Sequence, residues 1–382
     1  MKVLSKEEAL ASPHSTGGPN ETFVLNLGPQ HPATHGVLRV KLTMDGEFIT
    51  NAEPVCGYIH RMHEKMGENR TYSQFLPNTS RLDYLSAMQY THAWVGLVEK
   101  ACKIEVPQRA EYVRVITSEL NRIASHLVGW GAWVMDLGGF TPILYAFDDR
   151  EKILDLLEHI CGARLTFCYY RFGGLVNDVD DVFVQGTKDF IPYMRDRMKT
   201  YKKLVTENII LRKRIEGIGP VSQEMCLRYG ACGPVLRGSG FKSDVRINEP
   251  YSAYKDFDYE IPVYHEGDSM ARYLVRMDEI EQSLRIIEQA LAKLPEGPFI
   301  NPKVPRSIKL PAGDYTYATE AARGRFMIRV VSDGKDVPYR VKLRTPCLSN
   351  LSLFEEASKG MLLADALAFM GSLDLVIPDI DR

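Results

Sequence analysis

The segment PQRAEYVRVITSELNRIASHL, residues 107–127, has the strongest helical pattern of the chain. Its apolar residues recur at steps of three and four positions, at Ala110, Val113, Ile116, Leu120, Ile123 and Leu127. This spacing places them on one face of a helix that begins after Pro107. The other face carries charged residues and a histidine, at Glu111, Arg114, Glu119, Arg122 and His126. We therefore expect one long helix here with an apolar and a polar face.

Helical patterns continue through most of residues 60–295, and strand patterns stand on either side of them. Further helices are expected near 148–171, 186–214, 268–294 and 353–370. Strands are expected within 22–56, with a hairpin turn at Asp45 and Gly46, and within 324–344, with a turn at 332–334. We therefore predict an α+β fold: a central helical bundle with small antiparallel β-sheets formed by the N-terminal and C-terminal segments.

The same patterns divide the chain. We expect residues 1–20 to form a mobile N-terminal tail and residues 21–382 to form a single domain. Within that domain we expect an N-terminal β region at 21–56, a helical body at 57–295, and a connector, a hairpin and a C-terminal helix at 296–382. A loop is expected around Gly233, Pro234 and the GSG sequence at 238–240.

Composition excludes several classes of protein. A net charge of −2 over 382 residues argues against a nucleic-acid-binding surface and a polybasic membrane anchor. The N-terminus has no apolar secretory segment, and the most apolar stretch, 126–147, contains Asp136, Pro142 and glycines that argue against a membrane-spanning helix. The seven cysteines form no Cys-x-x-Cys pair, which fits a reducing compartment and gives no spacing for an iron–sulfur cluster.

Nucleotide-binding and hydrolase motifs are absent from the sequence. There is no G-x-x-x-x-G-K-[ST] loop, no G-x-G-x-x-G between a strand and a helix, and no G-x-S-x-G. ATP and NAD therefore have no evident binding site in this chain. A redox role would need electrons delivered from another polypeptide.

The segment GPQHPATHG, residues 28–36, places His31 and His35 between prolines and glycines. One interpretation is a tight turn with surface histidines. A second is a ligand-binding loop, in which prolines stiffen the backbone, glycines let a ligand approach and an imidazole donates a hydrogen bond. A metal-binding pair is a third interpretation, which two histidines without a nearby third ligand support weakly.

Two further segments contain candidate residues. Arg81, Asp83 and Tyr84 in the sequence RLDYL fit an ordinary helix surface, but a tyrosine can also donate a hydrogen bond to a carbonyl oxygen and deliver a proton. Asp136 stands among apolar residues in WVMDLGGFTP. It either ends a helix at the surface or, if buried, needs a partner such as a histidine.

A series of segments, in this order, closely resembles the D (49-kDa-type) subunit of respiratory complex I, the NADH:quinone oxidoreductase. The matching segments are 28–39, 57–65, 70–74, 81–85, 98–127, 144–151, 162–174, 233–240, 248–254, 332–346 and 371–382. Together they cover nearly the whole chain beyond residue 20. The resemblance implies the α+β fold of the large subunit of Ni–Fe hydrogenases, to which this family is related.

In those hydrogenases two cysteine pairs hold the metal. Their positions are matched here by Asp83, Ser86, Val376 and Asp379. Because no thiolate stands at any of them, the resemblance implies that this chain binds no metal and excludes hydrogenase chemistry. The vacated cavity is instead expected to receive the head group of a quinone.

The resemblance assigns roles to five residues. It implies that His35 and Tyr84 bind the quinone, and that Asp136 pairs with His35, so that these three residues form the catalytic group. It also implies that Arg81 and Thr166 lie near the 4Fe–4S cluster of the neighbouring B-type subunit. Many relatives have a histidine at the position of Thr166, whose proton uptake is linked to cluster reduction, and a threonine cannot take up that proton.

The resemblance also implies a function, partners and a location. Electrons from the cluster of the B-type iron–sulfur subunit would reduce quinone to quinol within a proton-pumping NADH:quinone oxidoreductase. The other expected partners are a C-type subunit, an I-type iron–sulfur subunit and a membrane H-type subunit, with no nucleic acid. The chain would be a peripheral protein on the cytoplasmic side of the inner (plasma) membrane.

Two alternative functions stay open at this point. Residues 296–318 form a shorter segment than in typical family members, so a ferredoxin- or F420-linked complex is conceivable. A non-catalytic scaffold for the cluster-bearing subunit is the other alternative. The joint presence of His35, Tyr84 and Asp136 favours a catalytic subunit, because a scaffold would not need all three.

Overall fold

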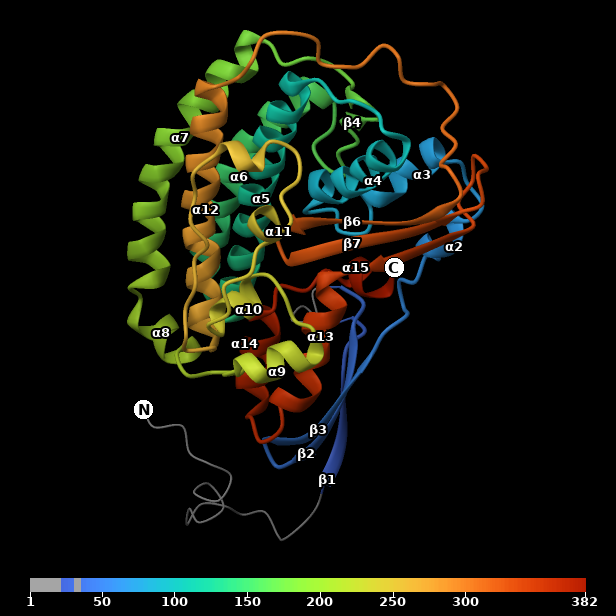
Figure 1. Cartoon of the computed structure of the whole chain (residues 1–382). Helices are drawn as coiled ribbons and strands as arrows, with labels where there is room; N and C mark the ends of the chain where they lie inside the picture. The colour runs from blue at the N-terminus through green and yellow to red at the C-terminus, as the bar shows by residue number, and fades with distance from the viewer. Residues whose placement is uncertain (1–21, 31–35) are drawn as a thin grey trace, which may run out of the picture.

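The long helix α5 (Gln108–Asp136) runs through the middle of the helical layer (Figure 1). The computed structural model describes residues 22–30 and 36–382, so the predicted tail at 1–20 and the predicted site residue His35 lie outside the described residues. Helices α6 (Phe140–Cys161) and α12 (Ser269–Ala292) pack against α5, and α7 (Asp181–Tyr201) packs against both of these. The helix expected after Pro107 is confirmed, and it extends beyond Leu127 to Asp136.

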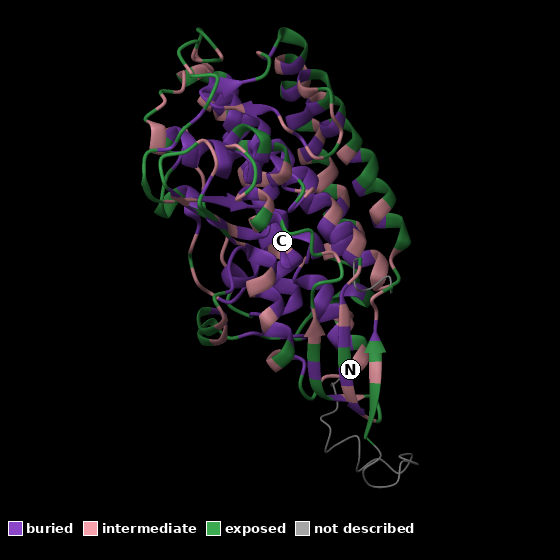
Figure 2. Ribbon diagram, turned by 90° about the vertical axis from the view of Figure 1, so that its right-hand side faces the viewer, coloured by how far each residue is buried: buried purple, intermediate pink, exposed green. Residues whose placement is uncertain are grey.

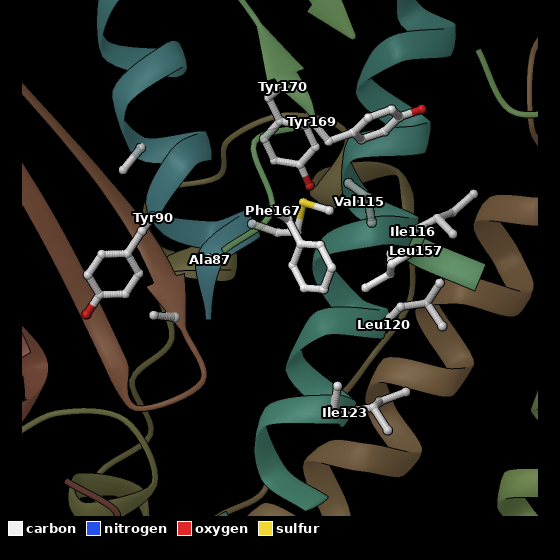
Figure 3. Packing of buried hydrophobic residues seen from close by; sticks show 14 of the residues in the cluster. Ala87, Tyr90, Val115, Ile116, Leu120, Ile123, Leu157, Phe167, Tyr169 and Tyr170 are labelled. Atoms are coloured by element: carbon white, nitrogen blue, oxygen red, sulfur yellow. The ribbon is translucent and has the colours of Figure 1, made fainter. Parts of the chain in front are cut away.

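The apolar face of α5 packs into the larger of two hydrophobic cores. Val115, Ile116, Leu120 and Ile123 lie in this core with Leu157 of α6 (Figure 3). The ring of Tyr90 from α4 (Ala87–Cys102) belongs to the same core and stacks on Phe326 at a centroid distance of 3.9 Å. Burial of these apolar side chains away from water is the main force that holds the helical layer together.

Two three-stranded antiparallel sheets flank the helices, which confirms the α+β prediction. The N-terminal sheet has the order β1-β2-β3 and the C-terminal sheet the order β6-β7-β8. Their strands are β1 (Thr22–Leu27), β2 (Arg39–Asp45), β3 (Phe48–Val55), β6 (Gly313–Ala321), β7 (Gly324–Ser332) and β8 (Arg340–Arg344). The predicted turn after Asp45 is present, and Gly46 has the positive φ of +59° that such a turn requires.

The remaining elements are short. A small hairpin joins β4 (Tyr170–Arg171) to β5 (Gly174–Leu175). The short helices are α2 (His63–Gly67), α3 (Tyr72–Thr79), α8 (Ile209–Ile215), α9 (Gln223–Tyr229), α10 (Pro234–Gly238), α11 (Val245–Asn248), α13 (Pro346–Ala357), α14 (Leu363–Ser372) and α15 (Ile377–Asp381). A π-helical turn spans Lys202–Thr206, and a 3₁₀ turn spans Tyr254–Asp256.

Several predicted boundaries were wrong, and glycines explain two of them. The helix expected at 148–171 is α6, which ends before Gly162, where φ is +72°. The helix expected at 353–370 is two helices, α13 and α14, separated at Gly360, where φ is +80°. A glycine in this left-handed conformation ends a helix because other residues adopt it at a steric cost. The helix expected at 186–214 is likewise interrupted, since the Asn208 side chain caps the start of α8.

The C-terminal segment closes the fold by packing against the N-terminal sheet. Met361 accepts a backbone hydrogen bond from Ile49 of β3 at 2.9 Å. The carboxylate of Asp381 accepts the amides of Gly57 and Ile59 at 2.8 and 2.9 Å. A second hydrophobic core fills the space between β1–β3 and helices α13 to α15. Figure 2 shows how far each residue is buried: buried residues run through the interior of the molecule, while β1 is mostly exposed. These contacts support the single domain predicted for 21–382, which stays a prediction.

The turn between β6 and β7 is held against a second backbone segment. A Cβ atom on Gly233 would lie 2.4 Å from the carbonyl oxygen of Arg323, and Gly233 has φ +65°. The loop expected around Gly233, Pro234 and 238–240 is wrong over Pro234–Gly238, which form helix α10, while Gly233 just before it is a tight crossing point. No side chain larger than hydrogen fits there without moving the turn that carries Arg323.

Gly233→Ala should therefore destabilise the protein by about 2–4 kcal/mol, because it combines a left-handed backbone with a backbone clash. Gly217→Ala is the matched control: Gly217 has φ +70° but no atom within 4 Å of the added Cβ. Thermal unfolding of the purified protein measures both variants. Equal losses for the two variants would show that the close approach at Gly233 carries no cost.

Candidate functional site

Arg323 lies at the point where four segments of the chain meet. Its guanidinium donates to Asp83 Oδ2 at 3.0 Å, to Ser125 Oγ of α5 at 2.9 Å and to Asp374 Oδ1 at 3.0 Å. A longer contact of 3.4 Å reaches Ser86 Oγ. Burial opposes the charge of this side chain, but Asp374 and Asp83 outweigh that effect and raise the pKa of Arg323 above its usual value. Arg323 is therefore a fully buried, permanent cation.

Asp379 of α15 belongs to a second buried polar group, with Tyr90 and Cys347. Its carboxylate accepts a hydrogen bond from the Tyr90 hydroxyl at 2.6 Å and another from the Cys347 amide at 3.1 Å. Burial, and after it the charge of Asp83, raises the pKa of Asp379 to about 6. The carboxyl group of Asp379 can therefore change its charge near neutral pH, in contrast to an ordinary exposed aspartate.

The four positions that the resemblance to hydrogenases singled out, Asp83, Ser86, Val376 and Asp379, are all buried. Asp83 and Ser86 both contact Arg323. Val376 donates its amide to Cys347 Sγ at 3.4 Å, and Asp379 accepts the amide of the same cysteine. Within residues 22–30 and 36–382, no three His, Cys, Asp or Glu side chains are grouped so that they could hold a metal ion.

Tyr84 lies at the edge of this polar group. It follows Asp83 directly, is half-buried and packs against the second hydrophobic core, which includes Val376 and Ile377. Burial raises the pKa of the Tyr84 phenol, and among the nearby charges Arg323 lowers it while Asp83 raises it. The phenol is therefore neutral at physiological pH and can donate a hydrogen bond.

Asp136 is the last residue of α5 and is half-buried. Its predicted partner, His35, lies outside the described residues. The neighbouring Gly36 is described, and a Cβ on it would lie 3.3 Å from Ile377 Cγ1 of α15. Gly36, the last residue of the GPQHPATHG segment, thus lies against Ile377, which belongs to the hydrophobic core that Tyr84 packs against.

Arg81 and Thr166 lie outside the buried group. Arg81 is exposed just beyond α3, donates to the Pro77 carbonyl oxygen and accepts a hydrogen bond on its own carbonyl oxygen from Arg61 at 2.6 Å. Thr166 is half-buried in the loop between α6 and β4, with a φ of +49°. No hydrogen bond joins these two described residues.

The sequence did not reveal two buried groups. His63, at the start of α2, is 2% exposed and has no hydrogen-bond partner at either ring nitrogen. Burial, followed by the charges of Arg61, His60 and Arg81, lowers its pKa to about 4, so the imidazole is neutral. Arg323 is the second such group. Its only local sign is an arginine between small residues in EAARGR, which does not distinguish it from a surface arginine.

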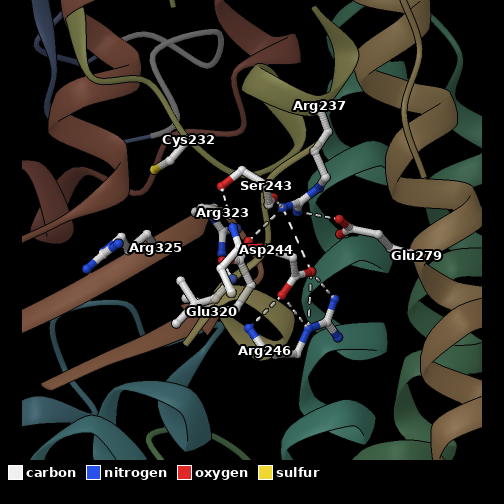
Figure 4. Close-up of polar contacts among 12 residues, drawn as sticks. Cys232, Arg237, Ser243, Asp244, Arg246, Glu279, Glu320, Arg323 and Arg325 are labelled. Atoms are coloured by element: carbon white, nitrogen blue, oxygen red, sulfur yellow. Dashed lines mark hydrogen bonds and ion pairs between the residues drawn. The ribbon is translucent and has the colours of Figure 1, made fainter. Parts of the chain in front are cut away.

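The polar face of α5 is also buried, and it is neutralised by charges from other elements. Glu119 accepts from Arg246 at 3.1 Å, and His126 contacts Glu279 of α12 at 2.8 Å. Around these contacts Arg237, Asp244 and Glu320 complete a network drawn in Figure 4. Burial acts to raise the pKa of Glu279, but Arg237 and His126 outweigh it and lower that pKa. The network fixes α5 relative to α10, α11 and α12.

Comparison with known proteins identifies the family. The family of the 49-kDa subunit of respiratory-chain NADH dehydrogenase matches residues 136–308 and 302–382. This chain belongs to that family.

Similar proteins carry matching names. A D-type subunit of the NADH-quinone oxidoreductase of Opitutus terrae is 73% identical over 364 residues, which are 95% of this chain and 91% of that protein. The D-type subunit of the same enzyme from Desulfotalea psychrophila is 69% identical over 97% of this chain and 100% of its own length. Its counterpart in Geobacillus kaustophilus is 49% identical over 94% of this chain and 98% of its own length.

Membership in this family makes the chain a subunit of an oxidoreductase complex with other complex I subunits. None of the helices in the described ranges combines the length and the apolar character needed to cross a bilayer.

The protonation of Asp379 is directly testable. A carboxyl whose pKa is raised stays neutral up to that pKa and ionises above it, so one protonated-carboxyl infrared band should disappear as the pH rises through about 6. In the purified complex, Asp379→Asn should remove this band at every pH. Asp314→Asn, which alters an exposed carboxylate paired with Arg329, should leave it unchanged. A band that persists in Asp379→Asn would assign it to another group.

Proposed function

We propose that this chain forms the quinone-reducing side of a proton-translocating NADH:quinone oxidoreductase. The observation that most supports this proposal is the position of Tyr84. Its phenol is neutral and lies at the edge of a buried polar group, next to the ion pair between Asp83 and Arg323. Such a phenol can donate a hydrogen bond to a quinone carbonyl oxygen and then its proton as negative charge develops there. The names of the similar proteins, all subunits of NADH-quinone oxidoreductases, support the same reaction class.

In this proposal the quinone head group binds between Tyr84 and His35. Reduction of a quinone to a quinol consumes two electrons and two protons. The electrons come one at a time from the 4Fe–4S cluster of a B-type subunit, near Arg81 and Thr166. Tyr84 and His35 each deliver one proton, and Asp136 favours the charged form of His35 before the transfer.

Loss of the His35 proton links chemistry to pumping in this proposal. A carboxylate that loses its cationic partner in a site of low dielectric constant is destabilised by several kcal/mol in order of magnitude. Asp136 would then drive a conformational change or a proton transfer toward the membrane subunits. The proposal is supported by Gly36, the last residue of the GPQHPATHG segment, which lies against Ile377 of the core that Tyr84 also packs against.

The proposal includes the partners and location of the chain. A B-type and an I-type iron–sulfur subunit, a C-type subunit and a membrane H-type subunit would surround it on the cytoplasmic side of the inner (plasma) membrane. NADH is favoured over ferredoxin or F420 as the electron source because the similar proteins carry NADH in their names. Identification of the electron-input subunit that co-purifies with the chain tests this choice.

Tyr84→Phe tests the catalytic role. The variant should assemble with a full complement of iron–sulfur clusters, while quinone reduction slows by about 10²-fold or more because the proton donor is lost. Tyr339→Phe is the control, since Tyr339 is 71% exposed in the connection between β7 and β8. NADH-driven reduction of a short-chain quinone by the purified complex measures both. Unchanged turnover in Tyr84→Phe would favour the scaffold alternative.

Asp136→Asn tests the coupling role. It keeps the size of the side chain but removes its charge, so proton pumping per quinone reduced should fall even where quinone reduction persists. Proton uptake by sealed vesicles, measured beside NADH oxidation, gives this ratio. A ratio equal to that of the unmodified complex would remove Asp136 from the coupling step.

A further inference from the structure

The residue that fixes Tyr84 is buried, belongs to a distant segment and has no role in the function described so far. We propose that Arg323 is the positioning residue of the quinone site: it holds the turn that carries Tyr84 and places a fixed positive charge beside the phenol that gives up a proton. This inference rests on the proposed function of Tyr84.

The backbone of Arg323 is held on two sides. Gly233 approaches its carbonyl oxygen so closely that a Cβ atom would lie 2.4 Å away. Asn350 Nδ2 of α13 donates to the same oxygen at 3.4 Å. The following residue, Gly324, has φ +126°, and a Cβ atom on it would lie 2.6 Å from the backbone nitrogen of Gly233. The side chain therefore leaves the β6–β7 turn in a fixed direction.

The guanidinium of Arg323 fixes the segment around Tyr84 through its contacts with Asp83. It contacts both oxygens of Asp83, Oδ2 at 3.0 Å and Oδ1 at 3.3 Å. Asp83 Oδ1 in turn accepts the amides of Leu85 at 3.1 Å and Ser86 at 3.2 Å. These amides follow Tyr84 in the chain, so a single carboxylate connects Arg323 to the residues on both sides of the tyrosine. The planar guanidinium makes this contact and the bond to Asp374 together, which a lysine cannot do.

The second effect of Arg323 is that its positive charge lowers the pKa of the Tyr84 phenol. Burial has the largest influence on the pKa of the phenol and raises it. Arg323 is the strongest of the nearby charges and favours proton loss, whereas Asp83, Asp374 and the Cys347 thiol act in the opposite direction. Without Arg323, the charges of Asp83 and Asp374 would raise the pKa of the phenol without this opposing cation, and Tyr84 would become a weaker acid.

A weaker acid transfers its proton more slowly, so removal of the charge should reduce turnover without preventing quinone binding. Arg323→Lys keeps the charge and loses the planar double contact, and we expect a decrease in kcat of about tenfold. Arg323→Gln loses both, with an expected decrease of about 10²-fold. The KM for quinone should change less than kcat in both variants, because Arg323 itself makes no contact with the quinone.

Arg323→Gln removes the cation that pairs with the buried carboxylate of Asp83, while Asp374 keeps Arg276 at 3.8 Å, and the loss can prevent assembly. The double variant Arg323→Gln with Asp374→Asn removes one carboxylate together with the cation and keeps the test available. Arg325→Gln is the matched control: Arg325 lies two residues away on β7 and forms an exposed ion pair with Glu249. It should leave kcat unchanged.

The deciding experiment is a double-mutant cycle on kcat in the purified complex, with cluster content verified by electron paramagnetic resonance. If Arg323 acts through Tyr84, Arg323→Lys should slow the Tyr84→Phe complex by less than about twofold, whereas it slows the unmodified complex about tenfold. Independent effects that multiply would overturn the inference while leaving the role of Tyr84 intact. A Tyr84→Phe complex with normal turnover would instead contradict the proposed function itself.

Discussion

The buried ion pair between Arg323 and Asp83 is the interaction on which the arrangement of the site depends. Both side chains are fully buried, and a cation in that environment is tolerated only with carboxylates and other hydrogen-bond acceptors around it. Meeting this requirement brings together the β6–β7 turn, the segment before α4, Ser125 of α5 and Asp374 after α14. The Tyr84 phenol is placed at the edge of the polar group as a consequence of these contacts.

A similar requirement organises the helical layer. The polar face of α5 is buried rather than exposed to water, and its charges are neutralised by Arg246, Glu279 and neighbouring residues of α11 and α12. Buried charged networks contribute little net stability compared with apolar packing, but unsatisfied members are costly. The network therefore favours one arrangement of the helices around α5, and that arrangement carries Asp136 and Ser125 on one rigid element.

Local sequence patterns predicted the elements with clear periodicity and failed where distant contacts decide. The α5 helix, the Asp45–Gly46 turn and the α+β class followed from spacing and turn residues. Strand β6 was missed because its pairing with β7 is needed to recognise it, and the role of Arg323 was missed because Asp83 lies 240 residues away in the sequence. Local segments made Tyr84, Asp136 and His35 candidates, and only the family resemblance gave them roles. These roles stay predictions, and His35 lies outside the described residues.

The region around Asp83 and Asp379 thus contains a salt bridge, a titratable aspartate and a phenol. The most direct test of its proposed use is a structure of the intact complex with a quinone bound and the membrane subunits present. The account predicts a quinone carbonyl oxygen about 3 Å from Tyr84 Oη, within hydrogen-bond distance. A head group bound elsewhere, or a Tyr84 sealed off by a neighbouring subunit, would contradict it.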